Sequence, residues 1–242
     1  LPTLLLPTPS LAQIKADPRA PGTQQPTVLT TSNGAPQINV QTPSAAGVSR
    51  NVYSQFDVQS NGAVLNNSRT GTASGVGGYV QANPWMAQGT ARVILNEVNS
   101  TAASQLQGPV EVAGDRAEVI IANPAGIAVN GGSFINASAV TLTTGTAVVN
   151  AGNLDGYRVQ GGMVSVSGQG LDTSGADYTS ILARAVQVNA GIWAKDLRVG
   201  TGANSLSASG VSSGAASGAA PVKVTLQDNS VDAAPTYALD VS

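Results

Sequence analysis

Short apolar blocks alternate with small and polar residues along most of the chain. From about residue 52, triplets of Val, Ile, Leu and Thr are separated by Gly, Asn, Ser and Ala, without the three-to-four-residue apolar spacing of an amphipathic helix. Pairs such as Asn-Gly and Gly-Gly between the triplets supply turn positions with positive φ. The pattern predicts strands and turns almost throughout.

The triplets recur at a nearly constant interval. VII, VTL, VSV and VQV begin at Val119, Val140, Val164 and Val186, in steps of about 21, 24 and 22 residues, which are typical of solenoids. One such unit buries too few apolar side chains to offset its lost backbone entropy, whereas stacked units pair their strands above and below. We therefore predict an all-β, right-handed parallel β-helix. A jelly roll or sandwich is the competing fold, because it also has short strands between turns.

Shifts in composition divide the chain into segments. Eight of the thirteen prolines precede residue 50, so residues 13–58 are expected to form short capping strands. Residues 59–242 are expected to form the coils, with possible extra-helical hairpins and a flexible Ser/Gly/Ala-rich excursion over residues 205–220. The pattern has no closing cap at its end, which suggests a fragment of a longer solenoid.

The first residues resemble the end of a secretory signal. Apolar residues precede Ser10-Leu11-Ala12, which has small residues at the two positions that a cleavage site requires. Residues 1–12 are therefore interpreted as a signal-peptide remnant, with a mature start at Gln13. An apolar leader unrelated to export is the alternative.

Composition excludes several classes of function. The chain of 242 residues carries a formal charge of −2, and its eleven Lys and Arg are scattered, so we expect no nucleic-acid binding. It contains no Cys and no His, which removes thiol nucleophiles, the usual zinc ligands and the commonest general base. We expect no metal, no cofactor and no catalytic residue. No segment approaches the roughly 20 apolar residues of a membrane-spanning helix, so stable membrane insertion is not expected.

Carboxylate and basic side chains gather in one later stretch. Some β-helix enzymes that cleave acidic polysaccharides collect such residues on one exposed face, so a polysaccharide lyase or hydrolase is one alternative function. A solvated charged face is the simpler interpretation. The residues are Asp172, Asp177, Arg184, Lys195, Asp196 and Arg198.

Five ordered segments together resemble a known family. They are NVYSQFDVQSNGAVLNNS (51–68), NPWM (83–86), ILNEV (94–98), ANPAGIAVNGGSF (122–134) and DYTSILARAVQVNAGIWAKDLRVGTGAN (177–204). In this combination the chain strongly resembles the secretion (TPS) domain of two-partner secretion exoproteins. These include filamentous haemagglutinin-type adhesins and contact-dependent growth inhibition effectors of the CdiA type.

The family pattern has two Asn-Pro motifs, Asn-Pro-Asn-Leu and Asn-Pro-Asn-Gly-Ile. Here the first is Asn83-Pro84-Trp85-Met86 and the second is Asn123-Pro124-Ala125-Gly126-Ile127, so both lack the inner Asn and the first has Met for Leu. In one interpretation the prolines start turns at corners of a coil and Ile127 returns to the core. In the other, a partner recognises the same segments while the chain is unfolded. Both can hold.

The resemblance implies a non-catalytic role in export. The periplasmic POTRA-type domains of a dedicated outer-membrane β-barrel transporter would capture this segment, and the chain would then fold as a monomer at the bacterial cell surface or outside the cell. The parent protein would be a large adhesin or growth-inhibition toxin. A host-cell-binding adhesin domain is the second alternative function.

Overall fold

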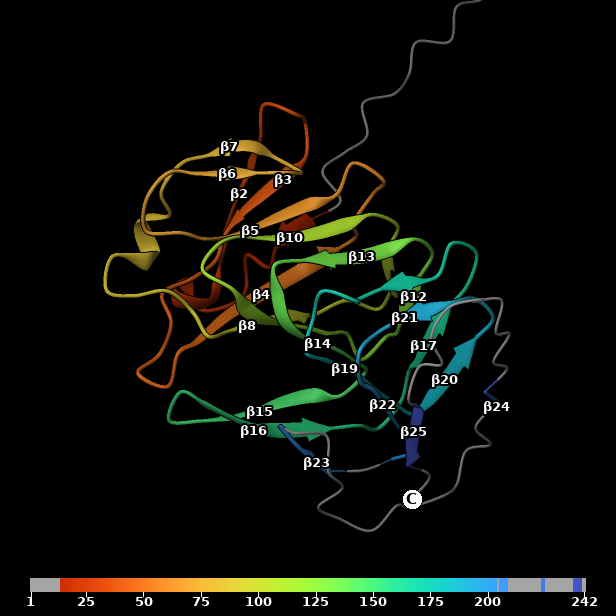
Figure 1. Ribbon diagram of the computed structural model, residues 1–242. Helices are drawn as coiled ribbons and strands as arrows, with labels where there is room; N and C mark the ends of the chain where they lie inside the picture. Colours follow the sequence, from red (N-terminus) through yellow and green to blue (C-terminus); the bar gives the residue numbers. More distant parts are fainter. Residues whose placement is uncertain (1–13, 204, 209–222, 225–236, 241–242) are drawn as a thin grey trace, which may run out of the picture.

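The chain winds into stacked coils, and the three sheets that form their faces enclose an apolar interior (Figure 1). The structure is a computed structural model that describes residues 14–203, 205–208, 223–224 and 237–240. Successive strands enter different sheets, and strands of successive coils pair in parallel within each sheet. This arrangement confirms the predicted all-β parallel β-helix. The predicted signal remnant, residues 1–12, lies outside the described residues.

The first sheet, face A, is the longest stack. Its order is β1-β4-β8-β11-β14-β19-β22-β25. All its pairs are parallel except β1 with β4, which is antiparallel. The strands are β1 (Ile14–Ala16), β4 (Val48–Phe56), β8 (Val93–Val98), β11 (Ala117–Ala122), β14 (Ala137–Thr143), β19 (Tyr178–Ala183), β22 (Leu197–Thr201) and β25 (Tyr237–Asp240).

The other two sheets close the coil. Face B has the order β2-β3-β5-β10-β13-β18-β21, and face C the order β24-β20-β17-β12-β9. Face B contains β2 (Thr27–Thr30), β3 (Pro36–Asn39), β5 (Ala63–Asn67), β10 (Pro109–Gly114), β13 (Gly132–Ile135), β18 (Leu171–Asp172) and β21 (Ile192–Trp193). Face C contains β9 (Ser104–Leu106), β12 (Ile127–Val129), β17 (Met163–Val166), β20 (Ala185–Val188) and β24 (Lys223–Val224).

Antiparallel strands cover the start of the stack. β1 pairs with β4, and β2 pairs with β3. The segment 13–58, expected to supply the cap, also contains β3 and β4, which already pair in parallel with β5 and β8. A short 3₁₀-helix, η1 (Gly22–Gln24), follows β1.

Two hairpins leave the coils and lie outside the β-helix (Figure 1). The first, β6 (Thr72–Ser74) with β7 (Gly78–Val80), is held by the buried Glu111 of β10. The Glu111 carboxylate accepts hydrogen bonds from the Ser74 hydroxyl at 2.6 Å and the Val76 amide at 2.7 Å. The second hairpin packs on face A by apolar contact; it consists of β15 (Thr146–Asn150) and β16 (Asn153–Arg158), joined by β23 (Ser205–Ser207). The rest of the predicted 205–220 excursion, beyond residue 208, lies outside the described residues.

The apolar triplets stack in register, but in two separate series. Val119 aligns with Val140 on face A, and Val164 aligns with Val186 on face C. The step of about 24 residues from Val140 to Val164 is therefore not one coil of the repeat, because the hairpin β15–β16 is inserted between β14 and β17 and Val164 belongs to another face. The partner of Val140 in the next face A coil is Thr179.

The interior is filled by stacked aliphatic side chains. Ile121, Leu142, Ile181 and Val199 occupy matching positions on successive strands of face A, and all are buried. The aromatic pair Tyr53–Phe56 packs edge to face at the capped end, with ring centroids 4.9 Å apart. The Tyr53 hydroxyl donates to Asn96 Oδ1 at 2.9 Å. Within the described residues, no helix has the length and apolar character to cross a membrane.

Candidate functional site

The first Asn-Pro motif forms the turn between the hairpin β6–β7 and strand β8. Pro84 begins the 3₁₀-helix η2 (Pro84–Met86), which suits its fixed φ and missing N–H. Asn83 caps it, since its Oδ1 accepts from the Trp85 amide at 3.0 Å. The Asn83 Nδ2 group donates to the carbonyls of Val40 and Asn66, each at 2.8 Å. Both ends of this buried amide are therefore engaged.

The second motif forms the corner between β11 on face A and β12 on face C. Asn123 Oδ1 accepts from the Ala125 amide at 2.9 Å, and Asn123 Nδ2 donates to the Ala102 carbonyl and to Ser104 Oγ, each at 3.0 Å. Gly126 adopts a φ of +125°. A Cβ at Gly126 would lie 3.0 Å from the Met163 carbonyl oxygen, so the position favours glycine both by conformation and by space.

Both motifs have buried ends and an outward-facing middle. Asn83 and Asn123 are 2% and 0% exposed, and Met86 and Ile127 lie in the apolar interior. The residues between them differ: Trp85 is 42% exposed, whereas Ala125 is half-buried. In the folded chain a partner therefore has access to the prolines and the inner residue, but not to the first Asn.

The sequence did not indicate what holds these asparagines. Their acceptors come from segments about 20 to 40 residues earlier, at Val40, Asn66, Ala102 and Ser104. An Asn before Pro is typical of an exposed turn, and no local pattern distinguishes a buried one. The recurrence of Asn-Pro before a buried apolar residue was the available clue.

The charged residues considered as a possible polysaccharide-cleaving site do not form one cluster in the structure. Asp177 forms a double ion pair with Arg116, with both N–O distances 3.2 Å. Asp196 pairs with Arg198 at 2.9 Å on face A, whereas Asp172 lies on face B and accepts from the Ser174 hydroxyl at 2.7 Å. Lys195 is exposed, and Arg184 lies between β19 and β20.

One further group of ionisable side chains lies on the outer surface of face A beside the second hairpin. Burial raises the pKa of Glu118, although the Thr141 hydroxyl, 3.3 Å away, and the Tyr178 hydroxyl bond to its carboxylate and oppose the shift. Burial first, and then the Glu118 charge, raises the pKa of Tyr157 well above its ordinary value. The Tyr157 hydroxyl is buried and has no hydrogen-bond partner among the described residues.

Within the described ranges, no three carboxylate, His or Cys side chains lie together in a way that would hold a metal ion.

The family model of the TPS secretion domain matches residues 12–242. The chain belongs to the TPS secretion domain family. A TPS domain implies a two-partner secretion transporter as partner and a non-enzymatic role for this segment. The crystal structure of a filamentous hemagglutinin secretion domain superposes with a TM-score of 0.72 at 34% identity, covering 94% of this chain and 73% of that chain.

Similar sequences occur in two much larger proteins. Toxin CdiA of Yersinia pestis is 55% identical over 197 residues, which are 81% of this chain and 6% of that protein. The tRNA nuclease CdiA-2 of Burkholderia pseudomallei (strain 1026b) is 42% identical over 231 residues, which are 95% of this chain and 7% of that protein. The TPS domain thus matches a small fraction of each relative, and the activities in their names belong to those whole proteins.

Proposed function

We propose that this TPS domain brings a large exported protein to the periplasmic POTRA-type domains and β-barrel of an outer-membrane transporter, and then folds at the cell surface or outside the cell. The family match over residues 12–242 is the observation that carries the proposal. The names of the two CdiA relatives favour a toxin as the parent protein. No observation on the described residues favours a polysaccharide-cleaving enzyme or an independent host-binding domain.

Burial of the two motif asparagines indicates when the transporter would recognise them. Asn83 and Asn123 are enclosed by hydrogen bonds in the folded domain. A partner that recognises their side chains must therefore do so while the chain is unfolded in the periplasm. The extended, Val- and Thr-rich segments of such a chain suit capture by β-augmentation, in which main-chain hydrogen bonds supply affinity.

Folding outside would then assist export. β11 pairs with β8 of the coil before it, and β14 pairs with β11 in turn. Each new coil adds strand pairs and buried apolar surface to an existing end, which opposes backsliding of the chain. A variant that folds poorly and is still exported at the normal rate would contradict this part of the proposal.

The test is export of this chain from cells with its transporter, comparing Asn123→Ala with Asn96→Ala. Asn96 is a matched control, because it is 0% exposed, lies outside both motifs and also makes three side-chain hydrogen bonds. Each substitution leaves buried polar groups unpaired and costs about 1–3 kcal/mol of folding stability. Urea unfolding of the purified variants measures that cost.

The proposal expects Asn123→Ala to reduce export severalfold more than Asn96→Ala at equal loss of stability. Pro124→Ala separates turn geometry from side-chain recognition, since Pro124 is exposed and its change leaves the Asn123 amide in place. Equal export of both Asn variants would leave the motif with a structural role only. Export without the transporter would refute the proposed function.

A further inference from the structure

A cavity of about 340 Å³ lies on the outer surface of face A. Its walls come from residues within five distant segments, 17–24, 50–52, 97–99, 122–124 and 145–147. The segments include the capping region, three face A strands, Pro124 of the second motif and the start of β15. The volume lies in the range of sites that bind small ligands, and because its walls span so much of the sequence, the cavity exists only after these coils have folded.

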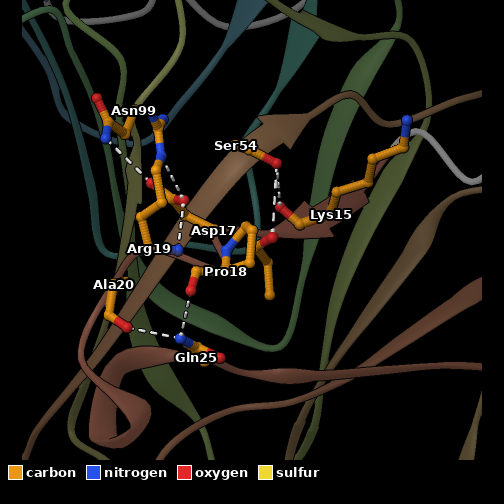
Figure 2. Close-up of polar contacts among 9 residues, drawn as sticks. Lys15, Asp17, Pro18, Arg19, Ala20, Gln25, Ser54 and Asn99 are labelled. Carbon is orange, nitrogen blue, oxygen red and sulfur yellow. Dashed lines mark hydrogen bonds and ion pairs between the residues drawn. The ribbon is translucent and has the colours of Figure 1, made fainter.

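Both oxygens of each of the two carboxylates in the cavity already accept at least one hydrogen bond. Asp17 Oδ1 accepts from the Arg19 amide at 2.9 Å and from Arg19 Nε at 3.3 Å, and Asp17 Oδ2 accepts from Asn99 Nδ2 at 3.0 Å (Figure 2). The Arg19 amide, more than any other group, holds the pKa of Asp17 below its ordinary value, so this carboxylate stays charged at neutral pH. Both Glu97 oxygens accept from Arg50, through its Nε and Nη2 groups.

The cavity contains unused hydrogen-bond donors on its two arginines. Arg19 is 76% exposed, and neither of its Nη groups has a partner among the described residues. The Nη1 group of Arg50 and the side-chain amide of Gln24 also lack partners within that part of the chain. A planar guanidinium with two free Nη groups matches a carboxylate, which accepts two parallel hydrogen bonds.

The cavity also borders an unpaired strand edge. β15 pairs with β16 and is an outer strand of its sheet among the described strands. Thr146 and Ala147, at the start of β15, line the cavity. The main-chain groups of an edge strand can pair with an added extended chain, and the volume exceeds what a single carboxylate group needs.

We propose that this cavity binds an extended acidic peptide segment of a partner protein, with a side-chain carboxylate on Arg19 and the main chain paired to the start of β15. The site would act on the folded domain, after export. It is therefore separate from recognition of the unfolded Asn-Pro motifs by the transporter.

The test is fluorescence anisotropy with the purified 242-residue chain and no transporter, so its result does not depend on the export assay. The probe is a labelled, N-acetylated and C-amidated peptide in which Glu alternates with Thr. We expect saturable binding that weakens about tenfold when Glu is replaced by Gln in the peptide, or when Arg19→Gln is made in the protein. N-methylation of alternate peptide amides is expected to weaken binding by a similar factor, because it removes main-chain donors.

Arg69→Gln is the matched control, because Arg69 is exposed, lies outside the cavity and donates a side-chain hydrogen bond to the Ala87 carbonyl. Circular dichroism and melting curves check that each variant keeps its fold. Absence of saturable binding, equal weakening by Arg19→Gln and Arg69→Gln, or no effect of the Gln peptide would overturn the proposal. Complete competition by acetate at the concentration of the peptide would show a site for free carboxylate only, and would also overturn it.

Discussion

In both Asn-Pro turns the buried Asn side chain makes the same kinds of hydrogen bond. The two turns differ in which parts of the chain these hydrogen bonds join. The Asn83 side chain donates to the carbonyls of Val40 and Asn66, and its main-chain amide donates to the Ser68 carbonyl, all on earlier segments. The Asn123 side chain donates to Ala102 and Ser104 of the coil before it, whereas its main-chain amide donates to Thr143 on β14 of the coil after it.

In a chain whose coils fold in sequence order, this difference decides when each turn can close. The partners of Asn83 all precede it in the sequence, so the first turn can close as soon as it forms. The second turn keeps one unpaired amide until β14 has stacked. We infer that the first turn consolidates the capped end and that the second turn couples one coil to the next.

The largest effect on stability is expected, in both turns, at the residue with which the turn returns to the core. Met86 is 0% exposed and Ile127 is 1% exposed, so replacing either by Ala leaves a cavity and costs roughly 2–5 kcal/mol. Met86→Leu nearly preserves the side-chain volume and restores the family residue, so it is expected to cost less than about 1.5 kcal/mol. Urea unfolding measures these values. A Met86→Ala variant as stable as the parent chain would show that η2 does not anchor the first turn.

Gly126 provides a second, smaller contrast. Gly126→Ala is expected to cost about 1–3 kcal/mol, because the φ of +125° is unfavourable for Ala and the new methyl group approaches the Met163 carbonyl. The first turn has no counterpart, since Ala87 after η2 has an ordinary φ of −55°. Ala87→Gly, on an exposed residue, is expected to cost no more than about 1 kcal/mol. Equal costs in unfolding experiments would remove this distinction between the turns.

The fold could be predicted from the sequence because short apolar triplets and Gly- or Asn-containing turns recur along the chain at the interval of one coil. The repeat from Val119 to Val140 is confirmed by their alignment on face A. The pattern failed where a hairpin interrupts it, because β15 has the same Val- and Thr-rich sequence as the coil strands but pairs with β16 instead of with another coil. Periodicity alone does not separate an inserted hairpin from a coil strand.

The site was less predictable from the sequence. The spacing showed that Asn-Pro recurs, but not that the asparagines are buried, since that depends on carbonyl groups supplied by distant strands. The cavity beside Pro124 left no sequence pattern either, because Arg19, Arg50 and Glu97 are far apart along the chain and meet only through the stacking of face A.

The strand that leads into the second turn is also expected to be pH-sensitive, with a smaller effect than the two above. The folded-state pKa of Glu118 lies above its ordinary value of 4.5, so the folded chain binds this proton more tightly than the unfolded chain. The contribution of Glu118 to stability is therefore full below about pH 4.5 and decreases as the pH rises through the raised pKa. Glu118→Gln should be more stable than the parent chain at pH 7 and lose that advantage toward pH 4. Urea midpoints across pH 4–8 measure the difference, and parallel curves would contradict the expectation.

The smallest effect on stability, and the sharpest test of recognition, is expected at the inner position of each turn. Trp85 is exposed and Ala125 is half-buried, so Trp85→Asn and Ala125→Asn, which restore the family residue, should change stability by no more than about 0.5 kcal/mol. If the transporter of this chain is adapted to the Trp and Ala found here, both variants should be exported less well, and Trp85→Asn should reduce export more because Trp offers the larger contact surface.

Tyr79→Asn is the matched control, because Tyr79 is an aromatic side chain that is 63% exposed and lies outside both motifs. Normal export of both motif variants would mean that the inner residue is not recognised. The difference between the turns would then be one of folding order alone.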